Sequence, residues 1–100
     1  MAMKKETELK FSQRFFEDIR SGKKRITIRL GLRDYPPEVC FEDRALKIDS
    51  VTHHKLKDIP DRDLLDDGFS SLREALIGLS VFYHDITPET KCTVVRFHLQ

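Results

Sequence analysis

Short connections between the predicted strands restrict this chain more than any other feature of its sequence. Strand-like runs cover residues 7–11, 25–30, 38–41, 44–52 and 92–99, and few of the segments between them are long. Parallel neighbours need crossovers of a dozen or more residues, whereas a tight turn can join antiparallel neighbours. We therefore predict an α+β fold in which helices flank a mostly antiparallel, curled sheet or small barrel.

The run over residues 25–30 is the clearest strand, because apolar and polar residues alternate along it. One face carries the apolar side chains Ile26, Ile28 and Leu30, and the other face carries Arg25, Thr27 and Arg29. The polar face either meets bulk solvent or lines a wet cleft.

Three segments have helical signals. These signals are Ser12 and Gly22 around the first helix, Pro60 and Gly68 around the second, and a capping box from Ser71 to Glu74 at the start of the third. The predicted apolar face of the third helix consists of Leu72, Ala75, Leu76, Leu79, Phe82 and Tyr83. A sheet with two or three flanking helices follows from this order.

Length and composition indicate one globular domain over residues 1–100. Hydrophobic residues make up 39% of the chain and charged residues 35%, a balance typical of folded rather than disordered proteins. No apolar run approaches the ~18 residues that span a bilayer, and the first residues lack the apolar stretch of a signal peptide. We expect a cytoplasmic protein that does not bind membranes.

No cofactor or metal site is predicted. The glycines Gly22, Gly31, Gly68 and Gly78 do not cluster, so the chain has no glycine-rich phosphate loop. His53 and His54 are adjacent on a predicted strand and point to opposite faces, so they cannot share one metal ion.

Basic residues gather in the first third of the chain. Residues 1–34 hold 10 Lys and Arg against 5 Asp and Glu, a net charge of +5, whereas residues 35–100 hold 8 against 12, a net charge of −4. The excess concentrates in Arg20, Lys23, Lys24, Arg25, Arg29 and Arg33. Such a cluster is either a solvated face or a surface that attracts phosphates at physiological salt.

Lys24 and Thr27 are candidate catalytic residues. Lys24 follows the end of the first predicted helix and lies next to the strand face that carries Thr27. A lysine near a threonine could lower the cost of an alkoxide or take up its proton. Asp66 and Asp67, just before Gly68, could supply the carboxylate that such a pair needs.

The chain closely resembles the ASCH domain family in residues 15–29, which read FFEDIRSGKKRITIR. In that signature, a helix that ends in a small residue and Gly is followed by a basic residue, Lys and Thr, and then by a short strand with a second Thr and an Arg. Residues 66–71, DDGFSS, resemble the family's second landmark, an acidic residue shortly before a helix. The resemblance covers nearly the whole chain and implies a single PUA-like β-barrel domain with a cleft between barrel and helices.

The resemblance also implies a function. The family is associated with RNA or nucleotide recognition, and one bacterial branch of similar length is an amidohydrolase that deacetylates N(4)-acetylcytidine with Lys, Thr and Glu. The family's lysine falls on Lys24, its threonine on Thr27 and its strand-end arginine on Arg29. Its glutamate falls nearest Asp67, with Asp66 as the alternative, so this chain has an aspartate at that place.

Two functions follow as expectations. In the first, the chain binds RNA or a modified nucleoside: Lys23, Arg25 and Arg33 hold phosphate, while Lys24, Thr27 and Arg29 contact a base or sugar. In the second, it is an amidohydrolase in which Thr27 attacks or orients water, Lys24 moves protons and Asp67 positions the lysine. A ribonuclease is the weaker third choice, because the sequence shows no histidine pair suited to it.

Overall fold

The computed structural model of the protein describes residues 4–6 and 8–100. In chain order the elements are β1 (Lys4–Lys5), the 3₁₀ helix η1 (Gln13–Phe15), α1 (Phe16–Ser21), β2 (Ile26–Leu30), β3 (Arg33–Asp34), β4 (Glu38–Phe41), β5 (Arg44–Lys55), the 3₁₀ helix η2 (Leu56–Asp58), α2 (Asp61–Asp66), α3 (Leu72–Leu79) and β6 (Lys91–Leu99). The predicted α+β class is confirmed, and the predicted strands over 25–30, 38–41, 44–52 and 92–99 correspond to β2, β4, β5 and β6.

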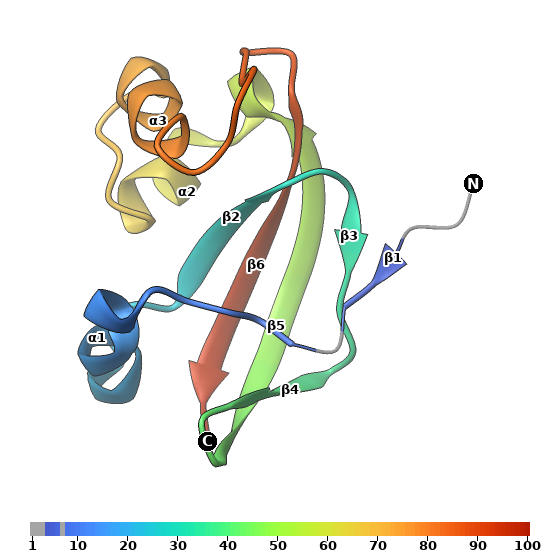
Figure 1. Cartoon of the computed structure of the whole chain (residues 1–100), viewed down its shortest axis with the longest axis vertical. Coiled ribbons are helices and arrows are strands. Elements are labelled where there is room, and N and C mark those ends of the chain that lie inside the picture. Colours follow the sequence, from blue (N-terminus) through green and yellow to red (C-terminus); the bar gives the residue numbers. More distant parts are fainter. Residues whose placement is uncertain (1–3, 7) are drawn as a thin grey trace.

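A four-stranded antiparallel sheet, in the order β2–β6–β5–β4, forms the centre of the molecule (Figure 1). Every pairing in it is antiparallel, as the short connections predict. The register of β5 against β6 shifts between Ile48 and Ser50, a bulge of the kind that bends a long strand. β1 and β3 form a separate parallel pair of two residues each.

The sheet is open, so the predicted closed barrel is wrong. The segment over residues 7–11, a predicted strand, does not close it. Thr7 lies outside the described residues, Glu8 makes one isolated bridge to Cys40 of β4, and Leu9 packs on a face of the sheet. Residues 8–11 thus form no ladder, so β2 pairs only with β6 in the described part of the chain and keeps a free edge.

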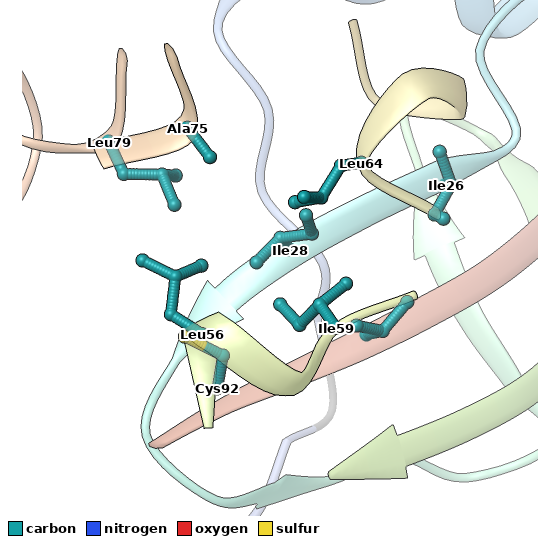
Figure 2. Packing of buried hydrophobic residues seen from close by; sticks show 9 residues of the cluster. Ile26, Ile28, Leu56, Ile59, Leu64, Ala75, Leu79 and Cys92 are labelled. Atoms are coloured by element: carbon teal, nitrogen blue, oxygen red, sulfur yellow. The ribbon is translucent and has the colours of Figure 1, made fainter. Parts of the chain in front are cut away.

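Each face of the sheet carries its own apolar cluster, because neighbouring residues of β6 point to opposite sides. Cys92 and Val94 belong to the first cluster, and Val95 and Phe97 belong to the second. Figure 2 shows the first cluster, in which β2, η2, α2 and α3 meet through Ile26, Ile28, Leu56, Ile59, Leu64, Ala75 and Leu79. The second cluster includes Leu9, Ile19 of α1 and Tyr35. Together the two clusters hold the helices on either side of the β2 edge.

The start of α3 forms as predicted, and its end does not. Ser71 Oγ accepts a hydrogen bond of 3.1 Å from the Glu74 N–H, and the Glu74 carboxylate accepts one from the Ser70 N–H, which completes a capping arrangement. The helix stops at Leu79, so Phe82 and Tyr83 lie in the turn that follows it. No helix in the described part of the chain is both long enough and apolar enough to cross a membrane.

Candidate functional site

A cleft of about 590 Å³ lies along the free edge of β2. Its floor includes Thr27, Ile28 and Arg29 of that strand, one wall comes from the segment before and within η1, and the other comes from Phe69 and the region around the end of α3. Its volume falls within the range of small-molecule sites, about 300–1,000 Å³.

A tight turn after α1 places Lys24 in this cleft. Gly22 ends the helix in the left-handed region at φ 82°, and its N–H donates to the Ile19 carbonyl. The Lys24 N–H then donates to the Asp18 carbonyl, which folds the chain back toward β2. A residue with a Cβ would be strained at position 22, so the predicted helix-ending role of Gly22 is confirmed.

Lys24 and Asp67 form a buried ion pair across the cleft. Lys24 Nζ lies 2.8 Å from Asp67 Oδ1, and their side chains are only 13% and 8% exposed. Lys24 Nζ also lies 4.8 Å from the centre of the Phe15 ring, within the range of a cation–π contact. The pair joins two segments that are 43 residues apart in the sequence.

The two adjacent aspartates have different surroundings. Asp66 faces away from Lys24 and accepts a hydrogen bond of 2.8 Å from Arg96 of β6, which also binds Asp63. Burial raises the pKa of Asp67, and the positive charge of Lys24 partly offsets this effect. The backbone N–H of Ile28, on the β2 edge, acts in the same direction as Lys24. The structure therefore brings Asp67, and not Asp66, to the predicted lysine.

Thr27 and Arg29 project from β2 into the same cleft and contact each other. Arg29 Nε donates to Thr27 Oγ1 at 3.0 Å, and its terminal nitrogen Nη2 donates to the Lys10 carbonyl. The Arg29 guanidinium also lies 4.9 Å from the centre of the Phe11 ring. Burial is the main cause of the lowered pKa of Arg29. Thr27 is 6% exposed, so this strand face lines the cleft rather than open solvent.

The other predicted binding residues lie outside the cleft. Lys23 is exposed at the turn, and Arg25 donates to the Gly22 carbonyl and borders a separate hollow beside α1. Arg33 follows β2 and is held by an ion pair of 2.6 Å with Glu6. The predicted residues thus divide into a cleft group of Lys24, Thr27, Arg29 and Asp67 and a peripheral group of Lys23, Arg25 and Arg33.

Sequence reasoning missed the aromatic side chains that line the cleft. These are Phe11, Phe15, Phe69, Phe82 and Tyr83. Phe82 and Tyr83 were assigned to a buried helix face, yet Phe82 is 55% exposed because α3 ends before it. Phe69 packs directly on α3: a Cβ added at Gly78 would lie 2.6 Å from its ring. Phe11 and Phe15 both lie shortly before the basic residues at 23–25 in the sequence, and this proximity is the one sequence signal for an aromatic site.

Comparison with known proteins identifies a similar fold and indicates no function. No protein-family model and no curated protein matches this sequence. The chain is similar to the crystal structure of hypothetical protein PH0355, with a TM-score of 0.70 and 20% sequence identity. The likeness covers 98% of this chain and 100% of that one. At this identity it shows that the α+β fold has a solved counterpart.

The cleft combines apolar walls with a few converging polar groups. Lys24 has three N–H donors and Asp67 has two carboxylate oxygens, and their mutual hydrogen bond occupies only one of each. Thr27 can still donate its hydroxyl proton, because Arg29 uses it as an acceptor. Among the described residues, no group of three or more His, Cys, Asp or Glu side chains could hold a metal ion. The arrangement suits a flat ligand with hydrogen-bonding edges.

Proposed function

We propose that this chain is an ASCH-like module of the PUA-like type that binds RNA or a modified nucleoside in the cleft at the β2 edge. The observation that carries the proposal is the buried Lys24–Asp67 pair inside an aromatic cleft. A charged pair that is withdrawn from solvent, but not fully used by its own hydrogen bond, is suited to read the edge of a base. Such a ligand also agrees with the cytoplasmic location predicted from the sequence.

The aromatic side chains of the cleft are suited to stack on the face of the base. Two of them already hold cations, since Lys24 lies over Phe15 and Arg29 lies over Phe11. Phe82, exposed at the rim of the cleft, and Tyr83 remain for stacking. Stacking on an aromatic side chain contributes about 1–3 kcal/mol per base.

Calorimetric titration with cytidine and N(4)-acetylcytidine tests the proposal. The double variant Lys24→Met/Asp67→Asn removes both charges of the pair together, so neither partner is left as an unpaired charge. We expect it to weaken binding by about 1–2 kcal/mol, because it removes hydrogen bonds to the base edge. Lys23→Met is the matched control, an adjacent exposed lysine that should leave nucleoside binding unchanged. Equal affinity of the double variant and the wild type would contradict the proposal.

A second function, hydrolysis of the acetyl amide of N(4)-acetylcytidine, is supported by one specific feature. Asp67 is one methylene shorter than the family's glutamate, yet it reaches Lys24 at 2.8 Å beside Thr27. Thr27 Oγ would attack the acetyl carbonyl or orient water, aided by the Arg29 hydrogen bond to this oxygen. Lys24 would donate a proton to the departing amine. The reaction consumes one water and gives cytidine and acetate.

Chromatography of N(4)-acetylcytidine incubated with the protein distinguishes the two functions. Hydrolysis requires cytidine and acetate in equal amounts, and loss of both products in Thr27→Val. Binding without product supports the binding module alone. Product from Thr27→Val at the wild-type rate would exclude Thr27 from the reaction.

A further inference from the structure

A second hollow, of about 360 Å³, lies beside the cleft. The two share Lys10, Arg29 and Tyr83 among their lining residues, so these side chains separate one space from the other. Glu6, Arg33 and Tyr35 line the second hollow only. Its volume also falls within the range of ligand sites, about 300–1,000 Å³.

Tyr35 is the residue of this hollow that combines a buried ring with a polar group. Its side chain is 7% exposed, and its ring belongs to the second apolar cluster. No group in the described residues hydrogen-bonds to its hydroxyl, although no fully buried side-chain N or O atom there lacks a partner. Tyr35 lines the hollow, so a ligand bound there can contact its hydroxyl.

The groups around Tyr35 include both hydrogen-bond donors and hydrogen-bond acceptors. Arg33 is fixed by Glu6 at 2.6 Å and by the Leu30 carbonyl at 2.7 Å. Burial raises the pKa of Tyr35, and the nearby charges of Arg29 and Arg33 partly offset this. Donors from tyrosine and arginine next to a glutamate acceptor match the mixed edge of a base or ribose. A bare phosphate would meet the carboxylates of Glu6 and Glu8 there.

We infer that the cleft and the Tyr35 hollow are consecutive subsites for two neighbouring nucleotides of one RNA strand, with Arg29 and Tyr83 between them. This inference rests on the proposed function and deepens it, because it makes the ligand a dinucleotide or longer RNA rather than a free nucleoside. The polar hollow would accept the second nucleoside, and the shared Arg29 lies where the connecting phosphate would pass.

The test compares three classes of ligand by calorimetry: cytidine, cytidine monophosphates (5′ and 3′), and the dinucleotides CpN and NpC with all four bases. We expect the best dinucleotide to bind wild type at least about tenfold more tightly than cytidine or either monophosphate. Tyr35→Phe keeps the buried ring and removes the hydroxyl. It should cost that dinucleotide about three- to tenfold in affinity, the range of one hydrogen bond, and leave cytidine unchanged.

Glu6→Gln is a second variant, which removes a carboxylate from the same hollow without altering the apolar cluster. It should weaken dinucleotide binding at least about threefold.

Monophosphates that bind as tightly as every dinucleotide would overturn the inference and indicate a phosphate contact only. A dinucleotide advantage that survives both substitutions would overturn it as well. If cytidine binds and depends on Lys24 and Asp67 but no dinucleotide binds more tightly, the inference fails while the proposed function stands. If no ligand responds to the Lys24→Met/Asp67→Asn change, the proposed function itself fails.

Discussion

At Asp67, two opposing effects act on one carboxyl group. Burial disfavours its charge and raises its pKa, while the ammonium group of Lys24 at 2.8 Å favours the charge. The pKa stays above its ordinary value of 3.8, so burial is the larger effect. Carboxyl groups whose pKa is shifted by burial and by a specific charged partner are common in functional sites.

This balance makes the stability of the protein depend on pH. A carboxyl whose pKa is higher in the folded than in the unfolded state binds more protons when folded, so it stabilises the fold less as pH rises from 3.8 through the raised value. We expect wild type to lose free energy of unfolding relative to Lys24→Met/Asp67→Asn over this interval. Urea unfolding of both proteins from about pH 3.5 to about pH 6 measures the difference. A difference that grows in favour of wild type with rising pH would show that Lys24 outweighs burial.

The sequence predicts the position of some site residues and not of others. The alternation in 25–30 and the glycine at 22 predicted a turn and a strand face, and these bring Lys24, Thr27 and Arg29 into one cleft. The choice between Asp66 and Asp67 depends on a rotation of about 100° per residue at the end of a short helix, which no local pattern determines. The contacts that distinguish the two aspartates are long-range: Arg96 binds Asp66 across 30 residues and Lys24 binds Asp67 across 43.

Among the elements, α2 has the greatest influence on the site because Asp67 follows directly from its last residue. The helix has only six residues and no side-chain cap at its first turn. Leu64 anchors it in the first cluster, and Arg96 of β6 binds Asp63 and Asp66 from outside. Since an isolated helix of this length is unstable in water, these tertiary contacts hold Asp67 in place.

Replacing Arg96 with Gln should therefore destabilise the protein. We expect a loss of about 1–3 kcal/mol in free energy of unfolding, because two charge-assisted hydrogen bonds disappear and Asp63, 16% exposed, loses its partner. Arg62→Gln is the matched control on the same helix: its side chain is 87% exposed and lies 4.0 Å from Asp66, so its loss should cost under about 0.5 kcal/mol. Urea denaturation compares the two. Equal effects would show that Arg96 does not hold α2.

Sheet closure was the main element-level error, and its cause is specific. The extended pattern in 7–11 predicted a strand, but among residues 8–11 the backbone pairs only through Glu8, while Leu9 packs in the second cluster. Whether an apolar residue near the chain start joins an edge or covers a face depends on the curvature of the finished sheet. The free edge of β2 that results is the place where the cleft forms.

On the scale of the whole molecule, the cleft lies where the basic and acidic parts of the chain meet. Residues 1–34, with their net charge of +5, supply Lys24 and Arg29, and the acidic remainder supplies Asp67. Several of the other cations are already paired, for example Arg20 with Glu42 and Arg33 with Glu6. The charge excess seen in the sequence is therefore used in part within the fold. The cleft keeps some of it, because Lys10, Arg14, Lys24 and Arg29 line it against the single carboxylate of Asp67.

Chemical-shift mapping of the backbone amides during titration with cytidine tests the central claim, that the ligand site is the cleft at the β2 edge, most directly. We predict the largest changes over residues 22–30, 66–69 and 78–83, which line or support the cleft. Small changes are predicted over β4 and its turn into β5, because this edge lies at the opposite side of the sheet. Changes confined to β4 and β5, or no changes at millimolar cytidine, would contradict the claim.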